Sequence, residues 1–132
     1  MDEGLADFSI KQAQKYGASY VEARIETTTA NSLVMKNGTI EASSFDSFEG
    51  IGIRFIINKK LGFVSTNELT KKRISEILEK ALKITKATKT IGEDTYLSKE
   101  KTENAKYEVK QKQKLADIGV EKKISLLQEA EK

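Results

Sequence analysis

The chain has 132 residues, enough for one folded domain with a single core, with a hydrophobic content of 38%, a charged content of 33% and a formal net charge of +3. It contains neither Cys nor His, which excludes disulfides, thiolate nucleophiles, imidazole bases and any metal site built with a Cys or His ligand. No apolar run approaches the ~20 residues that a membrane-spanning helix needs, and the start Met1-Asp2-Glu3-Gly4 lacks the basic residues of a signal peptide, so we expect a cytoplasmic protein.

The first predicted element is a helix from Asp2 to Tyr16, followed by a strand from Ala18 to Thr29. Apolar residues recur at helical spacing through the first segment, and Gly17 supplies the left-handed residue that ends a helix. The second segment alternates apolar and polar residues with a period of two, which predicts a strand with one face in water. The polar face carries Glu22, Arg24 and Glu26.

Residues 31–67 are rich in β-prone residues and are interrupted by turn signals, which predicts a meander of short antiparallel strands. The dipeptide Asn37-Gly38 joins two of them in a two-residue hairpin. Glu49-Gly50 predicts another reversal, and Asn58 to Gly62 a third. The strands expected between these reversals cover residues 33–36, 39–48, 51–57 and 63–66.

A second helix is predicted after Asn67, which is placed to cap it, because Ile74, Leu78 and Leu82 belong to an apolar series at helical spacing. The sequence therefore predicts an α+β fold in the order helix, antiparallel meander of four to five strands, helix. Short reversals make neighbouring strands antiparallel, so both helices should cover one sheet face. The row buried beneath them includes Val21, Ile25, Ile53 and Phe55.

Three domains or segments are expected along the chain. Residues 1–88 form the α+β domain, and residues 89–117 form a polar linker or strap, partly disordered, whose Tyr96, Leu97, Tyr107 and Val109 set no clear period. Residues 118–132 form a short amphipathic helix that begins a further segment. We therefore expect the chain to be a fragment of a longer protein.

Two motifs could indicate a binding function, and each also has a simpler structural explanation. Gly50-x-Gly52 resembles part of a phosphate-binding glycine loop, but the glycines begin a strand instead of opening a helix, which favours a structural role. The bases Lys71-Lys72-Arg73, with Lys80, Lys83 and Lys86, could form a nucleic-acid footprint. Acidic residues are interleaved along the same helix, which favours a solvated helix face.

No residue of this sequence is predicted to be catalytic, cofactor-binding or metal-ligating. Carboxylates are plentiful, yet no pair has a spacing that defines an acid/base dyad or a metal site, and Glu22, Arg24 and Glu26 have the pattern of an ordinary wet face. Ser and Thr nucleophiles have no His to activate them. An antiparallel sheet edge could pair with an extended peptide, a generic possibility for such folds.

The segments, in their order and spacing, resemble the N-terminal domain of the TldD/PmbA family, also known as modulators of DNA gyrase. The resemblance covers about residues 5–88, and the segment Asp117–Ile124 is in addition similar to the next helix of the family. It is carried by Ala18–Arg24, Lys36–Glu41, Gly50–Arg54, Gly62–Asn67 and the helix through Ala81.

This resemblance implies a cytoplasmic zinc metallopeptidase whose C-terminal domain binds zinc through a His-Glu-x-x-x-His motif and a Cys. It further implies homo- or hetero-dimers that enclose a chamber for small or unfolded peptides. None of those ligands is present here, so we expect a non-catalytic N-terminal region, with zinc bound elsewhere in the parent protein. Whether that parent is the zinc-bearing type or its zinc-lacking partner stays open, with the Gly-x-Gly-x-Arg and Gly-Phe-x-x-Thr patterns favouring the former.

The alternative, from a different class, is a free-standing peptide- or protein-binding module without enzymatic activity. It would use a sheet edge or the basic helix. Nucleic-acid binding is a weaker third hypothesis, and no membrane partner is expected.

Overall fold

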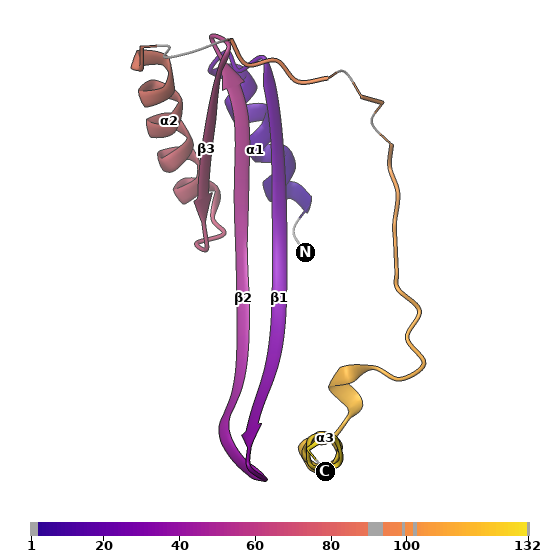
Figure 1. Ribbon diagram of the computed structural model, residues 1–132. Helices are drawn as coiled ribbons and strands as arrows, with labels where there is room; N and C mark the ends of the chain where they lie inside the picture. The colour runs from indigo at the N-terminus through magenta and orange to yellow at the C-terminus, as the bar shows by residue number, and fades with distance from the viewer. Residues whose placement is uncertain (1–2, 90–93, 99, 102, 132) are drawn as a thin grey trace. The chain divides into compact units, whose positions relative to one another are not determined.

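A computed structural model describes residues 3–89, 94–98, 100–101 and 103–131 (Figure 1). The elements follow the order α1 (Glu3–Lys15), β1 (Tyr20–Lys36), β2 (Thr39–Ile57), β3 (Lys60–Thr66), α2 (Lys71–Ala87), a 3-10 turn η1 (Leu115–Asp117) and α3 (Val120–Ala130). This order confirms the predicted α+β class. The chain divides into two compact units: unit 1 comprises residues 1–28 and 47–98, and unit 2 comprises residues 29–46 and 99–132.

The sheet has three strands, in the order β1-β2-β3, where the sequence predicted four or five. The segments predicted as separate strands at 18–29 and 33–36 both contribute to β1, and those at 39–48 and 51–57 both belong to β2. The predicted reversal at Glu49-Gly50 is wrong, because β2 continues through both residues. A tight two-residue reversal uses positive φ angles, and Gly50 is not among the described residues that adopt one.

The other two reversals occur where positive φ angles are found. Asn37 and Gly38 have φ angles of 51° and 74°, so the predicted two-residue hairpin is confirmed. The second hairpin turns at Asn58 and Lys59, with φ angles of 49° and 62°, and β3 therefore begins earlier than the predicted Phe63.

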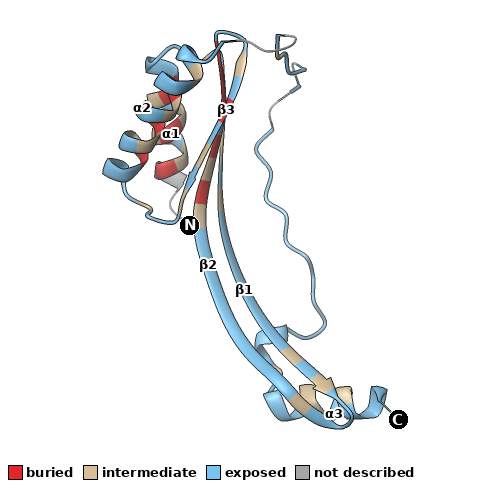
Figure 2. Ribbon diagram, turned by 60° about the vertical axis from the view of Figure 1, so that its left-hand side comes forward, coloured by how far each residue is buried: buried red, intermediate tan, exposed pale blue. Residues whose placement is uncertain are grey.

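The core of unit 1 lies between one sheet face and the two long helices. In β2, the alternating residues Ile51, Ile53, Phe55 and Ile57 are each at most 1% exposed. They belong to one cluster of buried residues with Ile74, Leu78 and Leu82 of α2 and Leu5 and Ala13 of α1. Figure 2 shows α1 and α2 on the same side of the sheet, which confirms the predicted arrangement. Val21 and Ile25 of β1 are partly buried against this cluster.

The register of β2 and β3 explains why Gly62 belongs in the middle of a strand. Phe55 lies opposite Gly62 across the ladder, and a Cβ atom at Gly62 would come within 2.4 Å of the Phe55 ring and 2.8 Å of Thr85 Oγ1. Only a residue without a side chain leaves that volume to the buried ring. Gly62 is therefore a core contact inside β3, whereas its neighbour Leu61 is exposed.

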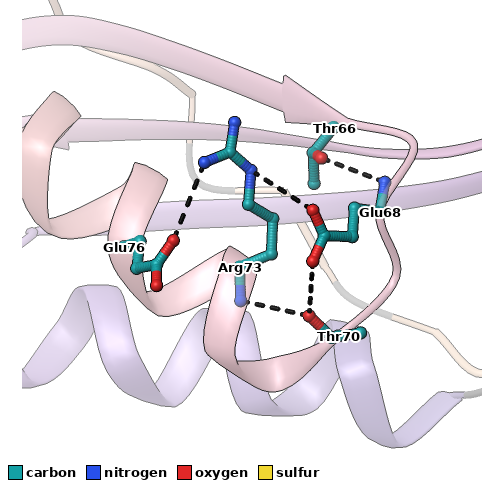
Figure 3. A network of polar contacts seen from close by, with 5 residues as sticks. All are labelled: Thr66, Glu68, Thr70, Arg73 and Glu76. Atoms are coloured by element: carbon teal, nitrogen blue, oxygen red, sulfur yellow. Dashed lines mark hydrogen bonds and ion pairs between the residues drawn. The ribbon is translucent and has the colours of Figure 1, made fainter.

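The ends of the two long helices follow ordinary capping chemistry, with one correction. Gly17 has a φ of 90° and follows the last turn of α1, as predicted. The predicted N-cap of α2, Asn67, is wrong, because α2 begins three residues later and Thr70 caps it by accepting a hydrogen bond from the Arg73 backbone N–H at 3.1 Å. Before the cap, the Thr66 hydroxyl accepts from the Glu68 N–H at 3.0 Å (Figure 3).

The segment after α2 is attached to unit 1 at its start. The Thr95 N–H donates to the Lys59 carbonyl at 2.9 Å, and Lys59 Nζ lies 2.8 Å from an Asp94 carboxylate oxygen. Of the predicted strap 89–117, residues 90–93, 99 and 102 lie outside the described residues, and the described part between 94 and 114 contains no helix or strand. The division of the chain at 88 and 117 stays a prediction.

Unit 2 combines the outer part of the β1–β2 hairpin with α3, which lies within the predicted helix 118–132, whose last residue Lys132 is not described. The Gly38 N–H donates to a Glu131 carboxylate oxygen at 2.6 Å, and Lys123 Nζ donates to Asn31 Oδ1 at 3.3 Å. Across the described residues of the chain, no helix is long and apolar enough to cross a membrane.

Candidate functional site

The sheet face opposite the helices carries the candidate site of unit 1. Because side chains alternate along a strand, burying Ile53 and Phe55 of β2 directs Gly52 and Arg54 to this open face. Glu22 of β1 lies on the same face, since its carboxylate meets Arg54. Across β3, Phe63 is the ladder partner of Arg54.

Three side chains of this face form a polar network. An Oε1–Nη2 contact of 2.7 Å joins Glu22 to Arg54, and the Tyr20 hydroxyl donates to the other Glu22 oxygen, Oε2, at 2.6 Å. Both oxygens of the Glu22 carboxylate are therefore engaged by donors from β1 and β2. Glu22 and Arg54 side chains are each about 44% exposed, so the network lies at the border of solvent.

The electrostatics of the network fix the charge state of its members. The Arg54 guanidinium, and then the Tyr20 hydroxyl, lower the pKa of the Glu22 carboxyl by hydrogen-bonding its ionised form. The same hydrogen bond to Glu22 raises the pKa of Tyr20, because the hydroxyl must keep its proton to donate it. Glu22 thus stays ionised near neutral pH and is a poor general acid or base.

Beside the network lies a groove of about 840 Å³, called here the open-face groove. All three strands contribute to it, and its lining comprises Glu22, Arg24, Glu26, Thr28, Phe48, Glu49, Gly50, Ile51, Gly52, Arg54, Phe63, Ser65, Thr66 and Asn67. A Cβ atom at Gly52 would lie 3.2 Å from Cζ of Phe63, so the glycine leaves room for that ring.

Two aromatic rings make the groove partly apolar. Phe48 is 64% exposed and Phe63 is 66% exposed, unusual for residues with this much apolar area. The groove therefore combines exposed aromatic surface with the charged side chains of Arg24, Glu26 and the Glu22–Arg54 pair. Such a combination suits recognition of an apolar group beside a polar one.

The described residues of the groove hold no cluster of three metal-ligating side chains. The sequence lacks His and Cys, and over the described ranges no three of the His, Cys, Asp and Glu residues gather closely enough to hold a metal ion. The acids that line the groove are spread over β1 and β2, and Glu22 is committed to Arg54 and Tyr20. The arrangement offers binding surface.

The motif Gly50-x-Gly52 lies inside β2 and lines the groove, so it does not form the strand-to-helix loop that a phosphate site requires. A Cβ atom at Gly50 would approach the Thr66 carbonyl oxygen to 3.3 Å. Both glycines therefore permit close packing against β3, which is the structural role favoured from the sequence.

The basic cluster at the start of α2 is held by contacts within the protein. Arg73 lies 3.9 Å from a Glu68 oxygen and 3.7 Å from a Glu76 oxygen (Figure 3). Lys71 Nζ lies 5.7 Å from the centre of the Phe8 ring. Further along α2, Lys83 pairs with Glu79 at 2.7 Å, and Lys86 donates to the Tyr16 carbonyl at 2.8 Å. These contacts support the interpretation of a solvated helix face.

Sequence reasoning placed Glu22, Arg24 and Glu26 on a wet strand face without a partner. The structure brings Glu22 to Arg54 and makes all three residues part of the groove. The signal was present, because Arg54 alternates with the buried residues Ile53 and Phe55 and must point to the open face. The pairing also depends on how β1 and β2 are aligned, which the sequence does not specify.

Comparison with known proteins gives a consistent result. Residues 21–85 match the family model described as PmbA/TldA metallopeptidase domain 1. A metalloprotease of Methanocaldococcus jannaschii is 26% identical over 109 residues, which cover 82% of this chain and 24% of that protein. The chain thus spans about a quarter of the length of this relative.

Two solved structures share the fold at low sequence identity. TldE from Thermococcus kodakarensis superimposes with a TM-score of 0.71 at 19% identity, covering 96% of this chain and 29% of that protein. A proposed modulator of DNA gyrase from Bacteroides thetaiotaomicron gives a TM-score of 0.61 at 18% identity, with 69% of this chain and 21% of that protein covered.

Proposed function

Because this chain belongs to the PmbA/TldD family, whose first domain it carries at residues 21–85, we propose that it is the N-terminal, non-catalytic region of a metallopeptidase that processes small or unfolded peptides. In this role it shapes a wall of the substrate chamber and part of a subunit interface, in the cytoplasm. The activity itself would belong to a longer protein, because the M. jannaschii relative is a metalloprotease of which this chain covers only 24%.

The open-face groove is the observation that carries the proposal. It has exposed aromatic rings from β2 and β3 and charged side chains from β1 and β2, yet its most constrained carboxylate, Glu22, is already ionised and fully hydrogen-bonded. A groove of this composition binds without reacting. Peptides offer both apolar side chains for Phe48 and Phe63 and polar backbone groups for the surrounding charges.

Zinc, which the family resemblance implies, does not fit the residues of this chain. Structural and catalytic zinc sites are built from Cys, His and carboxylate ligands held at tetrahedral positions. The 132 residues contain no Cys or His, and their described carboxylates form no cluster of three. Zinc ligands of the parent protein would therefore lie in another part of it, and no chemical step is assigned to zinc here.

The proposal is tested by measuring binding of short unstructured peptides to the 132-residue chain. We expect binding that weakens about tenfold in Phe63→Ala, equivalent to about 1.4 kcal/mol, because the exposed ring lies over the floor of the groove. Ile84→Ala is the matched control, since Ile84 is a similarly exposed apolar residue, 59% exposed, on α2. Stoichiometric zinc binding or peptide cleavage by this chain alone would contradict the proposal that zinc and catalysis belong to another part of the parent protein.

A free-standing peptide- or protein-binding module remains the second candidate. It is favoured by the exposed rings of Phe48 and Phe63, which offer a partner apolar surface. The two functions predict different results when Phe63→Ala is made in a family-length protein. If Phe63→Ala raises the KM for peptide cleavage there, the groove serves the peptidase; if cleavage is unchanged while binding to the isolated chain is lost, the groove serves a separate partner.

A further inference from the structure

Strand β2 extends well beyond its neighbour β3. The ladder between them runs from Ile51 opposite Thr66 to Ile57 opposite Lys60, and β3 ends at Thr66. Residues 39–50 of β2 therefore have β1 on one side and no strand of the described sheet on the other. A strand edge of this kind presents alternate backbone N–H and C=O groups that have no ladder partner.

This free edge of β2 lacks the features that usually prevent strand pairing. Natural edge strands are protected by lysines, prolines, bulges or a covering element. Residues 39–50 contain no Lys, Arg or Pro, and their three charged residues, Glu41, Asp46 and Glu49, are all acidic. The edge is thus open to a strand that carries positive charge.

A segment with the matching properties lies in unit 2, which also holds residues 39–46 of this edge. From Ala105 to Gln111 the sequence reads AKYEVKQ, in which Ala105, Tyr107 and Val109 alternate with charged residues at the period of a strand. Tyr107 is 94% exposed and Val109 is 83% exposed, although both residue types favour strands. No described residue from Glu103 to Gln113 makes a hydrogen bond to another described residue.

The charge of this segment is opposite to that of the edge. Residues 103–114 contain four lysines and two glutamates. The other free edge of the sheet, on β1, carries Glu22, Arg24, Glu26 and Lys36 and is balanced. Charge complementarity therefore selects β2 over β1 as the partner strand.

Attachment at its two ends gives the segment the correct direction. It starts at the turn that follows β2, where the Thr95 N–H binds the Lys59 carbonyl, and it leads to α3, whose Glu131 binds the N–H of Gly38 at the turn that precedes β2. A strand formed from this segment would therefore pair antiparallel with β2. From Tyr96 to Lys114 the segment has as many residues as the 19 of β2, so an extended chain has the reach.

We propose that residues 105–111 are a latent strand that pairs antiparallel with the free edge of β2 around residues 41–46. The added strand continues the row of β3 and closes the edge that β3 leaves open. In this state Lys110 and Lys112 approach the acidic side chains of β2, and the strap becomes a fourth strand of the sheet. The device would cover or uncover the β2 edge without any change in the core of unit 1.

Engineered disulfides test the pairing cleanly, because the chain has no cysteine of its own. Val109 is one of the alternating apolar residues of the segment, so Val109→Cys is combined in turn with Ala42→Cys, Ser43→Cys and Ser44→Cys, all at exposed positions of β2 in unit 2. Opposed residues of an antiparallel pair have the Cα separation that a disulfide requires, about 4.5–5.5 Å. We expect one of the three pairs to form an intramolecular disulfide in most molecules under mild oxidation.

The control pair is Val109→Cys with Ser32→Cys, which reports on the edge of β1. A faster cross-link with Ser32 would overturn the assignment to β2. Disulfide-linked dimers at low protein concentration would show that the strand is donated to a second copy, and would overturn the intramolecular pairing. Absence of any cross-link would overturn the proposal altogether.

Hydrogen exchange gives a second, independent measurement on the unmodified chain. We expect the backbone amides of 105–111 to exchange at least tenfold more slowly than those of Leu97 and Lys101. Val109→Pro removes a ladder donor and should abolish this protection, whereas Gln113→Pro, outside the pairing segment, should preserve it. Both positions are exposed and far from the core in sequence, so both variants should fold. Equal protection in the two proline variants would contradict the pairing.

Discussion

Unit 1 and unit 2 are built on the same two strands, and they differ in what those strands bury. In unit 1, β2 contributes Ile51, Ile53, Phe55 and Ile57 to a core covered by α1 and α2. In unit 2, the described residues of the same hairpin and of α3 are all exposed or only partly buried (Figure 2). Sequence accounts for this difference, because residues 41–47 of β2 read EASSFDS, which offers little apolar area to any covering helix.

The comparison teaches that a continuous strand need not have continuous stability. Regions with few buried apolar contacts open locally at a lower free energy than the core, and a two-stranded hairpin alone is marginally stable in water. Unit 1 should therefore determine global unfolding, while unit 2 opens in smaller steps. A strand pairing such as the one proposed for residues 105–111 would add backbone hydrogen bonds to unit 2.

The largest expected effect comes from emptying the core of unit 1. Phe55→Ala should lower the free energy of unfolding by about 3–5 kcal/mol, because the ring is fully buried and leaves a cavity. Phe45→Ala is the matched control in unit 2, where the ring is exposed, and it should change stability by about 0.5 kcal/mol or less. Urea unfolding followed by far-UV circular dichroism measures both. Equal losses would contradict the distinction between the units.

A smaller loss is expected when a side chain is added between the strands. In Gly62→Ala the new Cβ atom would come within 2.4 Å of the buried Phe55 ring, so stability should fall by about 1–3 kcal/mol. Gly52→Ala is the control: its Cβ atom would meet the exposed Phe63 ring at 3.2 Å, and that ring can move into solvent. Thermal unfolding should separate the two variants, and a larger loss in Gly52→Ala would show that the open face is more rigid than the core contact.

Unit 2 is expected to lose structure when its turn is altered. Gly38 has a φ of 74°, a conformation that costs an L-residue about 1–2 kcal/mol, and its N–H donates to Glu131. Gly38→Ala should accelerate hydrogen exchange at the hairpin end and in α3, and leave the amides of Ile53 to Ile57 unchanged. Acceleration across both units would mean that they unfold as one.

Much of the fold follows from local patterns in the sequence. The apolar series containing Ile74, Leu78 and Leu82 predicted α2, and Asn37-Gly38 predicted its hairpin. Glu49-Gly50 was wrongly predicted as a turn, because the local sequence cannot distinguish a glycine that turns the chain from one that admits a neighbour. That distinction depends on Thr66, whose carbonyl approaches Gly50 across the ladder.

The candidate site shows the same dependence on pairing. Glu22 and Arg54 are 32 positions apart in the sequence. Glu22 alternates with the partly buried Val21 and Ala23, and Arg54 with buried neighbours, so their shared face could be predicted. Their contact could not, since it requires the alignment of β1 with β2. The position of the Phe63 ring beside Gly52 could not be predicted either, because it requires the pairing of β2 with β3.

The smallest expected effect concerns the Glu22–Arg54 pair on the open face of unit 1. Folding lowers the pKa of the Glu22 carboxyl below its ordinary value of 4.5, because Arg54 and then Tyr20 bind the ionised form. A carboxyl with a depressed pKa stabilises the fold above its unfolded pKa, and that contribution disappears as pH falls through the folded pKa.

Glu22→Gln should therefore lower the urea midpoint slightly at neutral pH, and less at high salt, since both side chains are about 44% exposed. The difference should begin to shrink as the pH falls below 4.5 and should vanish only below the lower, folded pKa, where Glu22 is protonated in the parent. Glu26→Gln on the same strand controls for the lost charge, and a Glu22→Gln deficit that persists unchanged in acid would assign the effect to packing instead of the ion pair.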